Sequence, residues 1–201
     1  MPFSGQSYVA KAFGKLIQDH AQLLLVAVPG SYHSLLGALR RREIDAIIGI
    51  LWNATPYNDL VKTRLYHEKF SIIARRDHPC HKMTLNIQNL AEFNWIVAPH
   101  GTPVRQYFET LFRNAGATPP TQTCEILSFA TAEQTLVESW SVAMLTYSDA
   151  DMKSLRPDLK RVDFRLPDAS VDIGVTTLSD SVSNEPLGLF IQLFHGYCQI
   201  G

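Results

Sequence analysis

Apolar residues along this chain occur in two arrangements, at helical spacing and in short compact runs. Helical spacing predicts helices over residues 8–19, 32–42, 86–93, 104–115 and 187–197, and one more that opens at Thr131. Compact β-rich runs predict strands over residues 23–28, 44–48, 65–66, 70–74, 95–98, 124–127, 142–145, 161–166 and 171–176. The alternation of the two kinds of element predicts an α/β fold.

Residues that favour helix starts stand before several of these segments. Ser7, Ser31 and Asn86 are predicted N-caps, and Pro103 suits the first turn of a helix. Residues 44–48 lack polar alternation, which is typical of a buried parallel strand. With residues 23–28 and the intervening helix they predict a βαβ unit.

Composition narrows the classes of protein to which the chain can belong. It has 201 residues, 46% of them hydrophobic, which suits one large domain or two small ones with a sizeable core. The net charge of -1 lacks the basic excess of a nucleic-acid surface, so any DNA contact should come from another segment. Three irregularly spaced cysteines predict reduced packing residues. No run is long enough to span a bilayer and the first residues lack signal-peptide features, so we expect a cytoplasmic protein.

Three short motifs occur in a characteristic order. The sequence Leu-Arg-Arg-Arg-Glu-Ile-Asp-Ala-Ile-Ile-Gly occupies residues 39–49, Arg-Arg-Asp-His-Pro-Cys occupies residues 75–80, and Asn-Leu is followed by Trp-Ile within residues 89–96. Together they resemble the effector-binding domain of LysR-type transcriptional regulators. Arg42 stands where that family has a glycine, and Cys80 where it has a leucine. Residues 101–105 and 140–145 resemble the branch of the galactose-binding-protein regulator.

The resemblance implies two Rossmann-like lobes with the fold of type 2 periplasmic binding proteins. Lobe I would take residues 1–74 and 172–201, and lobe II residues 75–171. The family also carries an N-terminal winged helix-turn-helix and a linker helix, which this chain lacks, so we expect a regulatory fragment whose first strand lies upstream. The resemblance further implies an antiparallel, side-by-side homodimer, with the helix at residues 35–41 as a candidate edge. In the full-length protein it implies a tetramer and DNA binding through the N-terminal domain alone.

Candidate effector-binding residues follow from the rule that ligands bind beyond the carboxyl ends of strands in open α/β sheets. Backbone N–H groups and hydroxyls before helices suit an anionic or polyhydroxylated ligand. A glycine permits close approach of backbone, Phe129 offers an apolar wall, and Trp52 a surface for stacking. The candidates are Ser4, Gly5, Gln6, Ser7, Leu51, Trp52, Gly101, Thr102, Pro103, Phe129, Ala130, Thr131 and Tyr147.

Each candidate also has a purely structural interpretation. Ser7 and Thr131 suit helix caps, Gly101 and Thr102 suit a turn, and Trp52 suits a cover for the hinge or a dimer surface. The effector class stays open between a sugar, an organic acid and an aromatic acid. Arg75 and Arg76 would favour an acid if either faced the site.

Metal and catalytic chemistry find little support. His78, Cys80 and His81 are too close in sequence to surround one ion easily, so a hinge-region turn is the better interpretation. No catalytic motif or cofactor motif is present, so we expect neither an enzyme nor a cofactor. The alternatives to a ligand sensor are a free-standing solute-binding protein for transport and an enzyme of the prephenate-dehydratase kind.

Overall fold

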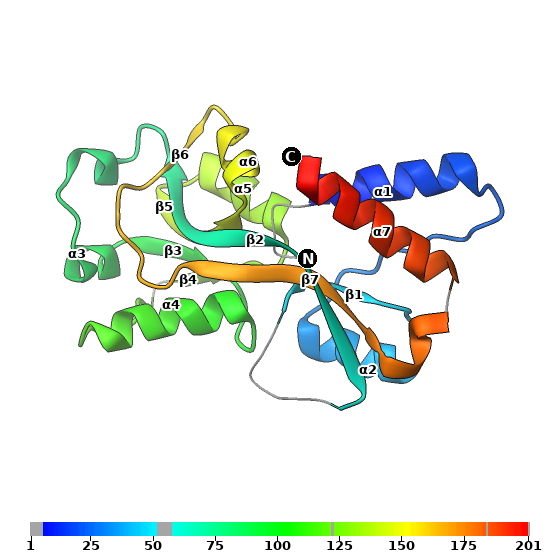
Figure 1. Cartoon of the computed structure of the whole chain (residues 1–201). Coiled ribbons are helices and arrows are strands. Elements are labelled where there is room, and N and C mark those ends of the chain that lie inside the picture. The colour runs from blue at the N-terminus through cyan, green and yellow to red at the C-terminus, as the bar shows by residue number, and fades with distance from the viewer. Residues whose placement is uncertain (1–5, 52–57, 122, 184, 201) are drawn as a thin grey trace. The chain divides into compact units, whose positions relative to one another are not determined.

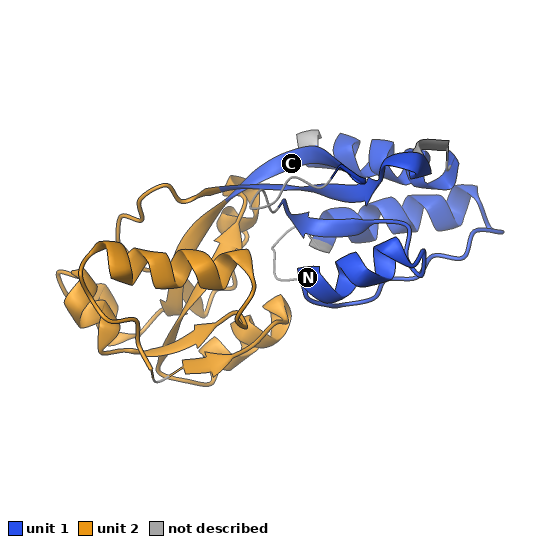
Figure 2. Cartoon of the chain, turned by 90° about the horizontal axis from the view of Figure 1, so that it is seen from below, with its two compact units in different colours: residues 1, 3–68, 171–201 blue, residues 2, 69–170 orange. Residues whose placement is uncertain are grey.

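The chain folds into two compact units (Figure 2). The computed structural model describes residues 6–51, 58–121, 123–183 and 185–200. Unit 1 is built from residues 3–68 and 171–201, and unit 2 from residues 69–170. The chain therefore passes between the units twice, and residues 69–74, which we expected in the first lobe, belong to unit 2.

Unit 1 combines helices with strands from distant parts of the sequence. Its elements are α1 (Gln6–Asp19), α2 (Tyr32–Arg40), β1 (Ile47–Ile50), the first part of β2 (Leu60–Arg75), β7 (Ser170–Leu178), the short 3₁₀ helix η2 (Ser179–Ser183) and α7 (Glu185–Ile200). Helices α1 and α7 pack on each other through Leu16 and Phe194, both fully buried, while Phe13 and Phe190 meet edge to face at 5.5 Å. This apolar contact gives unit 1 its main core.

Helix α2 forms as its end signals predict. The Ser31 hydroxyl accepts a hydrogen bond from the Ser34 N–H at 3.2 Å, which confirms the predicted N-cap. Leu35, Leu36 and Leu39 are buried against Ile47 of β1. Two residues after the helix, Arg42 has φ 57°, in the left-handed region that favours glycine. The family's preference for glycine at this position thus has a conformational reason.

Three local predictions for unit 1 are wrong. Residues 23–28 form no strand within the described part of the chain, and Leu24 and Val26 are exposed, because an extended apolar run becomes a strand only when another strand pairs with it. Strand β1 is antiparallel, not parallel, since its Ile47 lies opposite Thr176 of β7. Ser7 lies inside α1, which begins at Gln6, so Ser7 is not its N-cap.

Unit 2 is a sheet with helices packed on it. Its elements are the second part of β2, η1 (Pro79–Lys82), α3 (Ile87–Ala91), β3 (Asn94–Val97), α4 (Pro103–Asn114), β4 (Thr123–Glu125), α5 (Phe129–Val137), β5 (Ser141–Tyr147), α6 (Asp149–Lys153) and β6 (Leu159–Arg161). Strand β3 is parallel to both β4 and β5, while β2 is antiparallel to β5 and β6. Figure 1 shows α4 on one side of these strands and α5 on the other.

An aromatic cluster holds α4 against β3. Trp95 is 1% exposed, and its indole N–H donates to the Leu90 carbonyl at 2.8 Å. Phe108 and Phe112 of α4 meet this ring edge to face, with centroids 4.9 Å and 5.9 Å away. Such pairs contribute beyond their buried area, so the position of α4 on the sheet is well determined.

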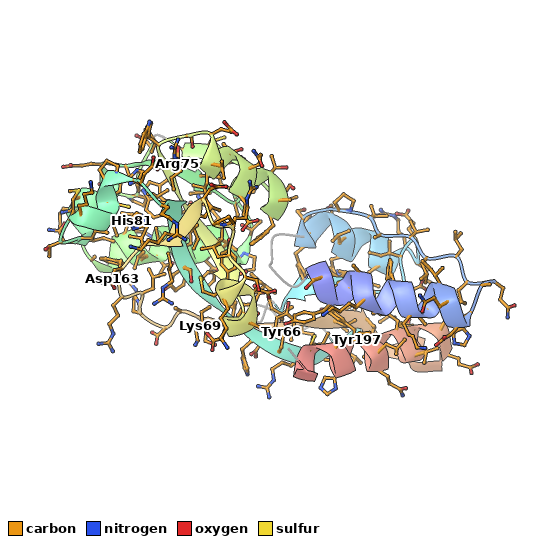
Figure 3. The ribbon with its side chains drawn as sticks, turned by 90° about the horizontal axis from the view of Figure 1, so that it is seen from above. Tyr66, Lys69, Arg75, His81, Asp163 and Tyr197 are labelled. Atoms are coloured by element: carbon orange, nitrogen blue, oxygen red, sulfur yellow. The ribbon has the colours of Figure 1, made fainter. Side chains whose placement is uncertain are left out.

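Some element boundaries in unit 2 differ from the prediction. The runs at residues 65–66 and 70–74 form one long strand, β2, on which Figure 3 labels Tyr66, Lys69 and Arg75. Helix α5 begins at Phe129 with Ser128 as its N-cap, so it opens earlier than the predicted Thr131. The predicted N-cap Asn86 is confirmed, within a reciprocal capping box, and Pro103 lies in the first turn of α4 as predicted.

Residues 161–166 were predicted as a strand, but β6 ends at Arg161. The chain then continues without regular structure until β7 begins at Ser170. Within the described ranges, no helix is both long and apolar enough to cross a membrane.

Candidate effector-binding site

A hollow of about 290 Å³, counting the solvent at its mouth, lies at one edge of the unit 2 sheet. It is lined by the end of β3 at residues 96–98, the loop at residues 126–128, and apolar side chains of α4, α5 and β5. Parallel strands β3 and β4 both end at this edge, because Val97 lies opposite Glu125. The helices that follow, α4 and α5, therefore begin at the same edge, where ligands of α/β sheets bind.

The turn into α4 is held by its own side chains. Gly101 has φ 78°, which a residue with a side chain rarely adopts. The Thr102 hydroxyl donates to the Pro99 carbonyl at 2.8 Å and accepts from the Arg105 N–H at 3.2 Å. Thr102 is 3% exposed, so its hydroxyl hydrogen serves the turn and not a ligand. Pro103 follows as the first helical residue and has no N–H to offer.

The start of α5 is built in a similar way. The Ser128 hydroxyl accepts from the Thr131 N–H at 3.3 Å and from the Thr131 hydroxyl at 2.9 Å. Phe129 lines the hollow and meets the Tyr147 ring edge to face at 5.3 Å. The Tyr147 hydroxyl donates to Glu133 at 2.6 Å. This hydrogen bond fixes the Tyr147 ring, on which Phe129 packs. Ala130 is exposed at the first turn of the helix.

The two helix starts leave backbone donors at this edge. The N–H groups of Val104, Phe129 and Ala130 find no acceptor among the residues that the structure describes. Val104 and Phe129 line the hollow. Such amides, together with the positive ends of two helix dipoles, favour a negatively charged or strongly polar group.

Arg105 does not add free positive charge to the site. Its guanidinium donates to Glu109 at 2.7 Å, to Glu125 at 3.0 Å and to Nε2 of His100 at 2.9 Å. The hydrogen bond from Arg105 lowers the pKa of Glu109, so that carboxylate stays ionised. Because two carboxylates neutralise Arg105, its main effect is to tie the turn at His100 to α4 and β4.

Only part of the predicted site comes together in unit 2. Gly101, Thr102 and Pro103 form the turn into α4, and Phe129, Ala130 and Thr131 form the start of α5. Of these residues and Tyr147, only Phe129 lines the hollow. The sequence analysis missed Val104, the apolar residues of β3 and β5, and the capping role of Ser128. A serine directly before the apolar residue Phe129 was the signal for Ser128.

The remaining predicted residues belong to unit 1 or lie outside the described residues. Ser4, Gly5 and Trp52 are outside them. Gln6 and Ser7 are the first two residues of α1. Leu51 is partly buried at the end of β1, where its N–H donates to the Asp172 carbonyl at 2.8 Å. Gly174 lies so close to Leu51 that a Cβ there would come within 2.9 Å of its side chain.

The histidines after β2 are engaged by backbone. Nδ1 of His78 accepts from the Cys80 N–H at 3.1 Å, and Nε2 lies 3.3 Å from the Trp140 carbonyl. Nε2 of His81 lies 2.9 Å from the Arg75 carbonyl. Burial lowers the pKa of His78 and raises that of Cys80 to about 11. These groups hold a turn, and the described residues contain no cluster of three potential metal ligands.

The two arginines that could have favoured an acid have partners of their own. Arg75 forms a two-pronged ion pair with Asp77 at 2.8 Å and 3.0 Å, and its guanidinium lies 4.6 Å from the centre of the Trp140 ring. Arg76 donates to the Pro157 carbonyl at 2.6 Å. Neither arginine lines the hollow.

Comparison with known proteins identifies relatives of this chain. It is 25% identical over 175 residues to the HTH-type transcriptional regulator GalR of Pseudomonas putida, covering 87% of this chain and 44% of the relative. It is 25% identical over 141 residues to the HTH-type transcriptional regulator GbpR of Azospirillum brasilense, covering 69% of this chain and 41% of the relative. The chain thus spans less than half the length of these relatives.

A solved structure shows the same fold. The regulatory domain of CcmR from Synechocystis PCC6803, in complex with 2-PG, superposes with a TM-score of 0.78 at 17% identity, covering 98% of this chain and 93% of that one. This confirms the predicted type 2 periplasmic-binding-protein fold. The family described as the LysR substrate binding domain matches residues 1–199, and the chain therefore belongs to that family.

Proposed function

We propose that this chain is the effector-binding regulatory domain of a LysR-type transcription factor, and that a small molecule binds at the unit 2 hollow. The observation that carries the proposal is the pair of capped helices, α4 and α5, which begin at one sheet edge beside the hollow. A ligand there would change transcription by favouring one arrangement of the protein over another, to the extent that its affinity for the two differs.

The lining of the hollow favours an acid with an apolar body. Free amides at Val104, Phe129 and Ala130 suit the oxygens of a carboxylate. The side chains of Phe129, Met144 and Leu145 suit an apolar or aromatic portion beside it. An organic or aromatic acid fits both features, whereas a sugar would leave the apolar wall poorly used. The solved structure of the CcmR regulatory domain, which has a similar fold, is that of a complex with 2-PG.

A thermal-shift screen of organic acids, aromatic acids and sugars tests this proposal, since a ligand that binds the folded state raises its melting temperature. The informative variant is Ser128→Ala, which loosens the start of α5 at the hollow. Its matched control is Ser148→Ala, because Ser148 caps α6, whose residues do not line the hollow.

Each substitution should cost about 1 kcal/mol as a lost N-cap. Only Ser128→Ala should also weaken the shift that an acid produces. Equal shifts in both variants, or a shift from sugars alone, would reject the assignment.

The whole protein would act through partners that this chain does not contain. We propose that DNA is bound by an N-terminal winged helix-turn-helix, that the domain forms homodimers and the full-length protein tetramers, and that it works in the cytoplasm. The leucines of the proposed dimer edge at residues 35–41 are buried within unit 1, so that helix is a poor edge. Exposed apolar residues of unit 1 suit the dimer better, namely Ile17, Leu24, Val26 and Val28.

Two other functions predict different observations. A transport protein would be encoded with an export signal upstream, and an enzyme would turn over its ligand. The coding region before Met1 separates the first from a transcription factor. Chemical analysis of the ligand after long incubation with the protein separates the second.

A further inference from the structure

The chain passes between the two units at residues 68–69 and again at residues 170–171. On the unit 2 side these two passages run next to each other. The Phe70 N–H of the outgoing passage donates to the Ala169 carbonyl of the returning passage at 2.7 Å. This backbone hydrogen bond joins the two passages within unit 2.

Tyr107 of α4 contacts both passages. Its ring stacks on Phe70, with centroids 4.0 Å apart and an angle of 15° between the planes. Its hydroxyl donates to the Pro167 carbonyl, two residues before Ala169. Tyr107, Phe70, Pro167 and Ala169 all belong to unit 2, so this contact set is internal to one compact body.

The returning passage makes a tight turn at a backbone conformation that few residues with a side chain adopt. Asp168, between the two anchored residues Pro167 and Ala169, has φ 43°. The left-handed region is uncommon for a residue with a side chain, and Asp is one of the residues that adopt it most often. Such a turn persists when the surrounding structure holds it, and here the hydroxyl of Tyr107 and the amide of Phe70 hold it from either side.

The Tyr107 hydroxyl keeps its proton at neutral pH and can therefore donate to the Pro167 carbonyl. Burial and the nearby charge of Asp168 raise its pKa to about 12. Tyr107 also stands three residues after Val104, about one helical turn from the hollow. A displacement at the start of α4 would therefore reach Tyr107 through a rigid helix.

We propose that Tyr107 is a positioning residue that ties α4 of the candidate site to both passages of the chain, so that α4 and these two segments respond together. This inference rests on the proposed function, since it states how the sensing helix is joined to the two segments that connect the units. It assigns to the Tyr107 hydroxyl the role of joining α4 to the returning passage, which a tyrosine that only fills space would not have.

Amide hydrogen exchange of the chain without any effector tests the proposal. The variant is Tyr107→Phe, which keeps the ring stack and removes the hydrogen bond to Pro167. The matched control is Tyr147→Phe, which also removes a tyrosine hydroxyl hydrogen bond in unit 2, but one to Glu133 of α5. Exchange reports the free energy of local opening, residue by residue.

In Tyr107→Phe the Phe70 amide should exchange faster by about two- to tenfold, the range expected for one lost hydrogen bond. Amides that join β3 to β5 should keep their rates, and Tyr147→Phe should leave Phe70 unchanged. Equal acceleration throughout unit 2 would show a purely structural tyrosine and overturn the proposal, as would no acceleration at all. Since no effector is present, failure of the proposed ligand leaves this test unaffected.

Discussion

Replacing Arg105 with methionine should destabilise unit 2 more than the same replacement of the exposed arginine in α4. The Arg105 side chain is 11% exposed and forms ion pairs with Glu109 and Glu125, whose side chains are 27% and 40% exposed. Methionine fills much of the volume but leaves both carboxylates without their partner. The matched control is Arg113→Met, because Arg113 is exposed on α4 and its contact with Thr110 is long, at 3.5 Å.

The magnitude follows from the two hydrogen bonds. Hydrogen bonds to charged groups contribute about 1.5–3 kcal/mol each when buried. Water reaches both glutamates, so the sum is reduced, and we expect a loss of about 2–3 kcal/mol for Arg105→Met, against at most about 0.5 kcal/mol for Arg113→Met. In a protein of this size the loss corresponds to a fall in melting temperature of about 4–12 °C.

The loss should also depend on pH in a defined direction. The hydrogen bond from Arg105 holds the pKa of Glu109 below its unfolded value, so its contribution is present above that value and disappears as pH falls through the folded pKa. Urea unfolding followed by tryptophan fluorescence should therefore show a larger difference between variant and parent at pH 7 than near pH 4. A difference that is constant with pH, or equal losses in the two arginine variants, would refute this reasoning.

Two further predictions concern single backbone and side-chain features. The Arg42→Gly variant should be at least about 1 kcal/mol more stable than Arg41→Gly, because Arg42 has φ 57° whereas Arg41 has φ -82° and gains nothing from a glycine. Chemical denaturation of both variants measures this difference. An equal or lower stability of Arg42→Gly would contradict the prediction. The raised pKa of Tyr107 means that its contribution is complete below the unfolded value near 10 and is lost as pH rises towards about 12. The stability difference between the parent and Tyr107→Phe should therefore shrink over that alkaline range in pH-dependent unfolding, and a constant difference would be the contrary result.

Local signals in the sequence predicted helix ends better than strand pairing. Ser31, Asn86 and Pro103 stand at helix starts as expected, because capping depends on a few neighbouring residues. The run at residues 23–28 has the composition of a strand, yet pairing depends on a second strand elsewhere. The direction of β1 was predicted wrongly for the same reason, since its partner β7 is distant in sequence.

The candidate site could be predicted only as two loops. The turn at Gly101 and the start of α5 carry visible signals, namely a glycine beside a threonine and a serine directly before an apolar residue. The apolar wall from Met144 and Leu145 carries none, because an inward-facing strand residue looks the same in sequence whether it lines a hollow or a core. The neutralisation of Arg105 by Glu125 of another strand was equally hidden.

The central claim is that a small acid binds where α4 and α5 begin. The most direct measurement is a titration of the isotope-labelled chain with the acid that gives the largest thermal shift, followed by amide resonances. The account predicts saturable shifts at the amides of Val104, Phe129 and Ala130, and much smaller shifts at α6. Saturation that leaves those three amides unmoved while others respond would contradict it.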